Sequence, residues 1–311
     1  MARYETPPQR QPPPVGTASP SPALPQPDSG DAEASLSSPL LAAGRGILYA
    51  LLTLLLIPLQ LLANALRLPL RRSLPQAYHR LVCWIMGINI AREGEISRAR
   101  PTLFVANHTS YLDIEIIGAV AQGSFVAMDE IRGWPGFGVL ARLQRSIFID
   151  CEARSLSEQT REIRARLDAG ENIFLFPEGG SHTGLHLLPF RSSLFAVAQR
   201  PAGQPPLVVQ PVTVVYEQLD GQPLGRHWRW LYAWNGKPSI LRHMFQAAGL
   251  GRLTVRVIFH KPGSIQDFAN NRKALCAHCF DAIQGSMSRV LAGTDSHAAL
   301  ASPQVLQSSP E

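Results

Sequence analysis

A histidine and an aspartate lie five residues apart at the end of an apolar run, residues 103–113, LFVANHTSYLD. A carboxylate that accepts a hydrogen bond from one imidazole nitrogen fixes the tautomer and makes the other nitrogen more basic. His108, held in this way by Asp113, would be able to take a proton from a hydroxyl group. An offset of five residues is about 140° around a helix, so the two side chains would not share a helical face. They meet only if His108 lies in a turn and Asp113 begins the following helix.

The same residues also fit a purely structural role. Ser110 and Asp113 have the Ser-x-x-Asp spacing of a capping box, in which the acidic side chain satisfies a backbone N–H group at the start of a helix. His108 would then simply end a strand. Residues 103–113 alone leave both interpretations open.

A second apolar run ends at residues 173–184, IFLFPEGGSHTG, with a proline, a glutamate and two glycines. Glycines let the backbone approach a ligand closely and can present amide donors. Glu178 would be a carboxylate at the same sheet edge as His108, because α/β sheets carry their sites at the carboxyl ends of the strands. Taken alone, this stretch also fits an ordinary glycine-rich turn.

The elements that must position these residues alternate between strand and helix. Short apolar runs typical of strands occupy 102–107, 124–128, 146–150, 172–176, 206–216 and 252–260. Helical patterns occupy 113–121, 135–144, 155–168 and 266–292. The alternation predicts the α/β class, with a mixed, mostly parallel sheet flanked by helices.

Residues 47–66, ILYALLTLLLIPLQLLANAL, form the most apolar stretch of the chain. About 20 such residues suffice to span a bilayer, so the sequence predicts an N-terminal membrane helix or hairpin. Pro58, Gln60 and Asn64 weaken the span, which leaves an interfacial segment and a buried helix as alternatives. Arginines follow the stretch and acidic residues precede it, which places its C-terminal side in the cytoplasm. These residues are Arg67, Arg71 and Arg72, and Asp28, Asp31 and Glu33.

The domain organisation follows from these patterns. Residues 1–39 hold ten prolines among polar residues, and such a segment buries too little apolar surface to order itself. We expect a disordered tail at 1–39, a membrane segment at 40–75, an α/β domain at 76–292 and a flexible tail at 293–311.

The composition narrows the possible partners. The chain is 45% hydrophobic and only 17% charged, with a net charge of +6, which favours an anionic membrane surface. No basic run or nucleic-acid-binding motif is present, so nucleic acid is not an expected partner. Cys276 and Cys279 form a Cys-x-x-Cys inside a helical pattern, and we expect helix packing there and no metal site.

Together these stretches resemble the glycerolipid acyltransferases typified by lysophosphatidate acyltransferase. NHTSYLD resembles the Asn-His-x-x-x-x-Asp block of that family, and FPEGG its Phe-Pro-Glu-Gly block. SIFID at 146–150 and VVQPVTVVY at 208–216 resemble two further blocks, in the same order, and the resemblance covers about residues 80–262. RGWPGFGVLARLQRSIFID, LPFRSSLF and RHWRWLYAWNG look most similar to the subgroup that acylates lyso-ornithine lipid.

The resemblance implies a membrane-bound enzyme that moves a fatty acyl group from acyl-CoA or acyl-carrier protein to the hydroxyl of a lysolipid. The acceptor would be 1-acylglycerol-3-phosphate or lyso-ornithine lipid, and no cofactor is implied. His108 would be the catalytic base and Asp113 its partner. Asn107, Glu178, Gly179 and Gly180 would help to bind substrate, with amides near the two glycines as our own candidates for stabilising the oxyanion. The enzyme would lie in a membrane of the bacterial inner-membrane type, with its catalytic domain facing the cytoplasm.

The chain departs from the family pattern where arginines are expected. Cys151 stands where the family usually has an arginine after the FID block, and Gly180, Ser181 and His182 replace a Thr-Arg or Thr-Ser pair. Those arginines are the expected clamps for an acceptor phosphate, because a guanidinium matches phosphate geometry. Their absence favours a lyso-ornithine acceptor over lysophosphatidate. Three arginines are candidate substitutes: Arg145, Arg154 and Arg191.

Other functions have weaker support in the residues. A membrane-associated serine or cysteine esterase or thioesterase would use Ser181 or Cys151, but the Gly-x-Ser-x-Gly elbow lacks its last glycine. GFGVLA at 136–141 imitates a dinucleotide fingerprint without following a strand directly. The Trp-rich segment 226–234 fits either a lipid headgroup layer or a strand with one buried aromatic face.

Overall fold

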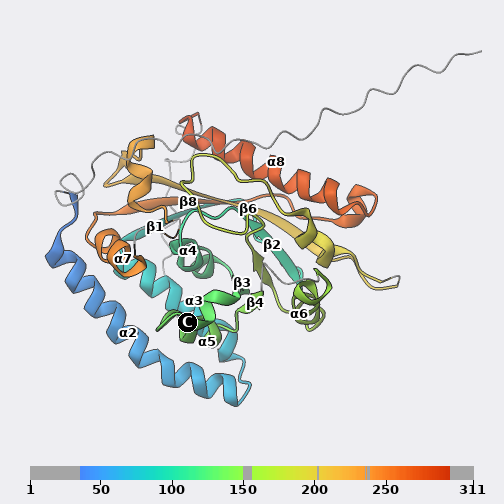
Figure 1. Cartoon of the computed structure of the whole chain (residues 1–311), viewed down its shortest axis with the longest axis horizontal. Helices are drawn as coiled ribbons and strands as arrows, with labels where there is room; N and C mark the ends of the chain where they lie inside the picture. The colour runs from blue at the N-terminus through green and yellow to red at the C-terminus, as the bar shows by residue number, and fades with distance from the viewer. Residues whose placement is uncertain (1–35, 150–155, 202, 235, 237–238, 295–311) are drawn as a thin grey trace, which may run out of the picture.

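The computed structural model describes residues 36–149, 156–201, 203–234, 236 and 239–294 (Figure 1). Seven strands form one continuous mixed sheet in the order β1-β8-β6-β2-β5-β3-β4. The neighbours β6, β2, β5, β3 and β4 run parallel to one another, whereas β8 is antiparallel to β6 and β1 is parallel to β8. The strands are β1 Ile88–Glu93, β2 Thr102–Ala106, β3 Ser124–Met128, β4 Ile147–Ile149, β5 Ile173–Leu175, β6 Val208–Leu219 and β8 Leu253–Phe259. Two short strands, β7 Gln222–Pro223 and β9 Gly263–Ser264, pair with β6.

Within the described ranges, seven α-helices accompany the sheet. They are α2 Pro39–Ala65, α3 Leu70–Ile85, α4 Leu112–Val120, α5 Phe137–Leu143, α6 Leu156–Asp168, α7 Ile240–Ala248 and α8 Arg272–Leu291. The described residues also contain four 3-10 helices, Asp129–Gly133, Ser192–Ala198, Arg226–Leu231 and Ile265–Phe268. The predicted α/β class with a mostly parallel sheet flanked by helices is confirmed.

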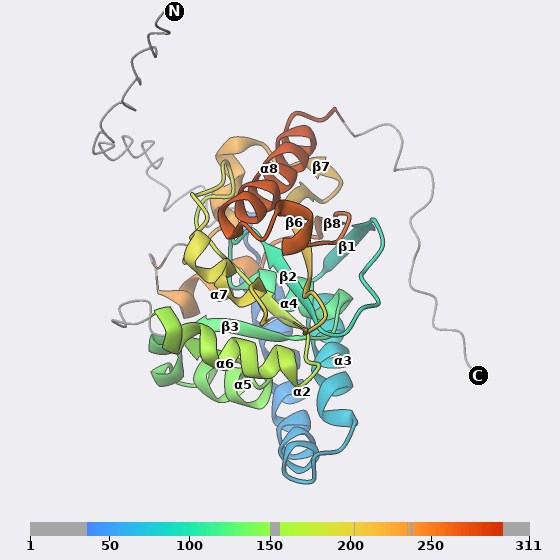
Figure 2. The same cartoon turned by 90° about the vertical axis from the view of Figure 1, so that its right-hand side faces the viewer.

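The core has two halves because the central strands are buried on both faces. In β2, Leu103 and Val105 belong to the half that contains α6 and α8, whereas Phe104 and Ala106 belong to the half that contains α4. Figures 1 and 2 show α8 on one side of the sheet and α4 and α3 on the other. Side chains of successive strand residues point to opposite faces, so an uninterrupted apolar run is what a doubly covered strand requires.

Helix α2 is the element that carries the predicted membrane segment. Within the described residues, α2 alone is long and apolar enough to cross a bilayer. Many of its leucines are exposed, among them Leu54 and Leu55, which excludes the buried soluble helix as an explanation of this stretch. The polar residues of α2 point inward instead: Gln60 and Asn64 each donate a 3.0 Å hydrogen bond to the Leu143 carbonyl at the end of α5.

Helices α2 and α3 form a hairpin that is attached to the α/β domain. Helix α3 packs on both α2 and α4, and it runs without interruption across the expected boundary between residues 75 and 76. The expected tails, 1–39 and 293–311, lie mostly outside the described residues, which begin at 36 and end at 294.

Two local expectations differ from the structure. The helix expected over 266–292 is α8, which begins at Arg272 after Asn271 caps it with hydrogen bonds from the Lys273 and Ala274 amides. The Trp-rich segment is a 3-10 helix at Arg226–Leu231 and not a strand. Arg229 attaches this 3-10 helix to the end of β6 and to the residue that follows β7. Its buried guanidinium donates hydrogen bonds to the carbonyls of Tyr216 and Leu224.

Candidate active site

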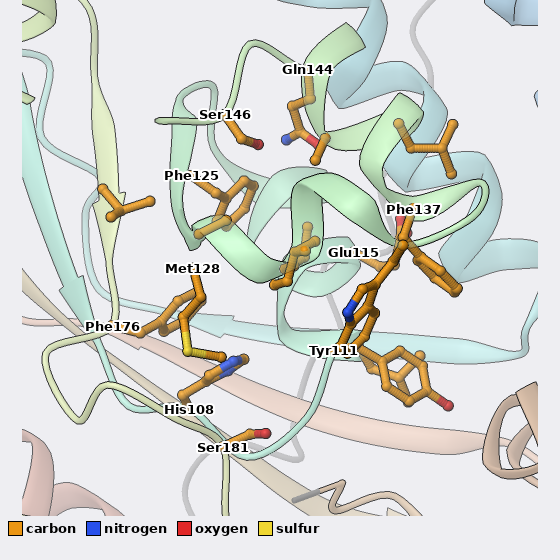
Figure 3. A pocket seen from close by; sticks show the side chains of 18 of the residues that line it. His108, Tyr111, Glu115, Phe125, Met128, Phe137, Gln144, Ser146, Phe176 and Ser181 are labelled. Carbon is orange, nitrogen blue, oxygen red and sulfur yellow. The ribbon is translucent and has the colours of Figure 1, made fainter. Parts of the chain in front are cut away.

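The candidate site lies where three parallel strands end. His108 follows β2, Met128 ends β3, and the FPEGG turn follows β5. Strands β2, β5 and β3 are neighbours in the sheet, so their carboxyl ends meet at one edge. Figure 3 shows His108, Met128, Phe176 and Ser181 gathered around the same opening.

His108 and Asp113 are in direct contact. His108 Nδ1 lies 2.9 Å from Asp113 Oδ2, and the imidazole ring stacks on Phe176 at 4.2 Å between centroids. Since Asp113 can only accept, Nδ1 carries a proton and Nε2 presents its lone pair. The His108 side chain is 18% exposed and lines a cavity of about 760 Å³, and Nε2 has no hydrogen-bond partner among the described residues.

Asp113 is fully buried and surrounded by donors. Oδ2 accepts hydrogen bonds from the backbone amides of Thr109, at 2.6 Å, and Ser110, at 2.9 Å, in addition to His108. Oδ1 accepts one from the Tyr216 hydroxyl at 2.8 Å. Burial raises the pKa of Tyr216 and the Asp113 charge raises it further, so the phenol keeps its proton and donates. The carboxylate therefore satisfies the turn before α4 and orients the imidazole at the same time.

Glu178 ties the glycine-rich turn to the backbone of His108. Its Oε1 accepts the His108 amide at 2.7 Å, and its Oε2 accepts the Leu188 amide at 2.8 Å and His182 Nε2 at 2.5 Å. His182 Nδ1 in turn accepts the Gly184 amide at 3.0 Å. Because both carboxylate oxygens are engaged and the side chain is fully buried, the structure places Glu178 as a support behind His108.

Asn107 is likewise engaged inside the protein. Its side-chain amide donates to the Val214 carbonyl at 2.9 Å and accepts from the Val214 amide at 2.8 Å. These two bonds extend the pairing of β2 with β6 by one residue beyond Ala106. They hold the chain in position immediately before His108.

Gly179 and Gly180 both line the cavity but differ in their amides. Gly179 has a φ of +77°, and its N–H donates to the Phe176 carbonyl at 3.2 Å. The positive φ favours glycine, and a Cβ at this position would lie 2.7 Å from the Arg191 guanidinium, which would have to move. The Gly180 amide has no partner within the described residues. Of the two amides expected to stabilise an oxyanion, only that of Gly180 is free.

The three candidate arginines lie in different places. Arg191 lines the cavity above Gly179. Arg145 lies before β4, at the opposite edge of the sheet, where it pairs with Glu171, so the structure does not bring it to His108. Arg154 and Cys151 lie outside the described residues.

A cavity of about 760 Å³ extends from His108 between the helices. Its walls come from α2, α3, α4 and α5, and most of its lining is apolar or aromatic. Pockets for small molecules usually have roughly 300–1,000 Å³, so this one is large enough for a long hydrocarbon chain. Sequence reasoning missed the lining residues Tyr111, Met128, Trp134, Phe176 and Trp234. The sequence shows tryptophans at positions 134 and 234. It does not show that the fold brings their ring centroids to 5.7 Å from each other.

The arrangement supports proton removal by His108 and gives little support to a serine nucleophile. The Ser181 hydroxyl donates to the Trp234 carbonyl and has no hydrogen bond to a base within the described part of the chain. The described residues also contain no cluster of three or more histidines, cysteines or acidic residues that could hold a metal ion. Cys276 and Cys279 are buried on α8.

Comparison with known proteins agrees with this geometry. A family model described as Acyltransferase matches residues 87–215. The chain is 38% identical over 232 residues to the lyso-ornithine lipid O-acyltransferase of Rhizobium meliloti, covering 73% of this chain and 80% of the relative. It is 36% identical to the enzyme of the same description from Brucella abortus, covering 78% of this chain and 92% of the relative. The chain belongs to the acyltransferase family.

More distant similarities point to the same fold. A 1-acyl-sn-glycerol-3-phosphate acyltransferase of Neisseria meningitidis is 33% identical over 171 residues, covering 53% of this chain and 63% of the relative. The crystal structure of the 1-acyl-sn-glycerophosphate acyltransferase PlsC from Thermotoga maritima superposes with a TM-score of 0.54. It is 20% identical and covers 79% of this chain and 97% of its own chain, so it shows a shared fold.

Proposed function

We propose that the protein is a lysolipid O-acyltransferase in which His108 is the general base and Asp113 orients it. The observation that carries this proposal is the 2.9 Å contact between His108 Nδ1 and a buried carboxylate, with Nε2 facing a large apolar cavity. The acyl donor is a thioester, acyl-CoA or acyl-carrier protein, and no metal or other cofactor takes part.

The reaction proceeds by direct attack. His108 Nε2 removes the proton of the acceptor hydroxyl, and the oxygen bonds to the thioester carbonyl carbon. The Gly180 amide, at the carboxyl ends of the strands, donates to the carbonyl oxygen as it becomes negative. The C–S bond then breaks, the thiolate takes the proton from the imidazolium, and an ester and a free thiol result.

The cavity holds the acyl chain of the donor. A lysolipid can leave its own chain in the bilayer, whereas the chain on a water-soluble carrier must find an apolar environment within the protein. Transfer of apolar surface from water contributes about 0.8 kcal/mol per methylene, which favours filling such a cavity. Phe176 stacks on His108 and Phe125 stacks on Phe176, and both line the cavity where the first carbons of the chain would pass.

Lyso-ornithine lipid is the acceptor that we favour. Its headgroup carries a carboxylate and an ammonium group, whereas lysophosphatidate carries a phosphate of higher negative charge. Of the described residues that line the cavity, Arg191 is the only lysine or arginine, and the carboxylates Glu115 and Glu130 line it too. Neither Arg191 nor Glu130 has a side-chain hydrogen bond or ion pair within the described residues, which leaves one cation and one anion available for such a headgroup.

Helix α2 anchors the protein in a membrane, with its exposed leucines in lipid. Arg67, Arg71 and Arg72 follow the helix and contact the anionic lipid surface on the cytoplasmic side, where the thioester carriers are found.

His108→Ala tests the proposed chemistry. Purified protein receives labelled acyl-CoA or acyl-carrier protein with a panel of lysolipids, and the products are identified by mass. We expect acylated lysolipid from the unaltered protein and a loss of about 10²–10⁴ in rate for His108→Ala, the usual contribution of a general base. His278→Ala, at an exposed position of α8, is the control and should retain full activity. Full transfer by His108→Ala, or release of free fatty acid as the main product, would refute the assignment.

A further inference from the structure

A second histidine–carboxylate pair lines the same cavity, away from the catalytic pair. His79 on α3 and Glu115 on α4 approach to 2.5 Å between Nδ1 and Oε2. His79 is 3% exposed, whereas the Glu115 side chain keeps 18% exposure although it lies on the cavity wall. Figure 3 shows Glu115 among the side chains around the cavity that also contains His108.

The position of His79 is fixed on several sides. Its ring lies against Gly118, where a Cβ would come within 2.4 Å of it, and it contacts the rings of Tyr78 and Phe125 edge-on. His79 Nδ1 can therefore hold the Glu115 carboxylate in one orientation. The second carboxylate oxygen, Oε1, has no hydrogen-bond partner among the described residues.

Hydroxyl groups line the same cavity as this pair, within a wall that is otherwise mainly apolar. The hydroxyls of Thr53 and Tyr78 are 3.0 Å apart, and both residues line the cavity together with Tyr49. A row of rings connects the polar patch to the reaction centre: His108 to Phe176 at 4.2 Å, Phe176 to Phe125 at 6.1 Å and Phe125 to His79 at 6.5 Å. The patch therefore lies farther along the cavity wall from His108 than the thioester carbonyl would.

A carboxylate is an unfavourable neighbour for a plain hydrocarbon chain. Burial of a charged or polar group without a hydrogen bond is costly, so a methylene chain that displaced water from Glu115 would lose part of the free energy gained by filling the cavity. A chain that carries a hydroxyl at this depth would avoid that loss, because the O–H can donate to Oε1. Hydrogen bonds to charged groups are among the stronger ones in proteins.

We infer that the His79–Glu115 pair is a recognition site for a hydroxyl group on the acyl chain of the donor, so that the enzyme prefers hydroxylated acyl thioesters. This inference rests on the proposed function, because it assumes that the donor chain occupies the cavity. It adds a substrate class and two residues that the transfer chemistry itself does not need.

The test is a competition between donors in one reaction. Palmitoyl-CoA competes with hydroxypalmitoyl-CoA that carries its hydroxyl near the thioester, in mid-chain or at the terminal carbon, with lyso-ornithine lipid and lysophosphatidate as acceptors. The product masses give the ratio of kcat/KM values for each pair. We expect one hydroxylated donor to be preferred by roughly tenfold or more, as a hydrogen bond to a charged group predicts. Glu115→Met should abolish that preference and increase the use of palmitoyl-CoA.

Glu115→Gln and Asp129→Asn complete the series. In Glu115→Gln the amide oxygen still accepts from His79 and the NH2 group can donate to a hydroxyl oxygen, so this variant should keep part of the preference and serves if Glu115→Met fails to fold. Asp129 is exposed and already paired with Arg132, so Asp129→Asn should behave like the unaltered enzyme. Equal use of all donors, or a preference unchanged in both Glu115 variants, would overturn the inference. Absence of transfer from every donor would instead count against the proposed function.

Discussion

Single residues at this site have roles that their types alone do not reveal. Glu178 stands in a motif that suggests substrate contact, yet both of its oxygens accept hydrogen bonds from the protein. Asp113 fits both a helix cap and a catalytic partner, and the structure shows the backbone bonds of the first and the imidazole contact of the second. A carboxylate with two oxygens can satisfy several donors, so spacing alone could not decide between the two readings.

A residue-scale prediction concerns the choice of acceptor. Glu130→Lys gives the cavity a second cation beside Arg191 and removes the proposed partner of an ammonium group. We expect the kcat/KM ratio of lyso-ornithine lipid to lysophosphatidate to fall by about tenfold or more, since a charged hydrogen bond contributes about 1.5–3 kcal/mol. The ratio is obtained from initial rates measured over a range of concentrations of each acceptor, at one fixed donor concentration. Asp129→Lys, at the neighbouring position outside the cavity lining, is the charge-matched control, and an equal shift in both variants would rule out a local effect of Glu130.

At the scale of elements, the segment 178–188 holds the backbone at the end of β2 by hydrogen bonds. The His182 amide donates to the His108 carbonyl at 3.3 Å, while Glu178 accepts the His108 amide, so both backbone groups of the base are held from one loop. His182 keeps Glu178 in place by donating to it. We therefore expect His182, which is not among the residues that line the cavity, to position His108 as the proposed base.

His182→Ala should lower kcat by about tenfold and leave KM for both substrates nearly unchanged. The substitution removes one of three donors to Glu178, and a small displacement of a catalytic group is enough to slow a reaction. His182→Gln can still donate from its side-chain amide and should recover much of the rate. Steady-state kinetics and thermal unfolding distinguish this outcome from a loss of folded protein. A rise in KM alone would show that His182 serves binding instead.

The elements themselves were largely predictable because their apolar runs are short and uninterrupted. Strands β2, β3, β5, β6 and β8 and helices α4, α5 and α6 lie where the pattern placed them. Strand β1 and helices α3 and α7 were missed. In β1, INIARE has only a partly buried strand pattern, and the sequence of α3 is rich in arginine and contains Pro75, which argues against a helix there. Their formation depends on tertiary contacts, β1 with β8 and α3 with α4, which one sequence does not display.

For the whole molecule, the main finding is that the apolar helix is part of the catalytic domain. Arg45 on α2 donates to the carbonyls of Ala248 and Leu250 at the end of α7, at 3.0 and 2.6 Å, and Gln60 and Asn64 bind the end of α5. Between these two attachments, Tyr49, Thr53 and Leu56 line the cavity. Composition indicated an anchor, but it could not show which side of the helix faces the protein.

Arg45→Met should therefore affect both stability and activity. It leaves two carbonyls without their donor, which costs about 1–3 kcal/mol for each buried group. We expect a lower melting temperature in detergent and a lower kcat/KM that is more pronounced for long-chain donors. Arg242→Met, at an exposed position of α7, is the matched control. A variant that melts earlier but uses long and short donors in an unchanged ratio would show that α2 is only an anchor.

The two sides of α2 are subject to different constraints on their sequence. On the side of the exposed leucines, which we propose to lie in lipid, any apolar residue would serve, so that side tolerates exchange among apolar residues. On the side of Tyr49 and Thr53, a substitution alters the shape of the cavity that we propose for the acyl chain. If α2 is the anchor that we propose, an apolar helix from another protein in its place should restore membrane attachment without restoring acyl transfer.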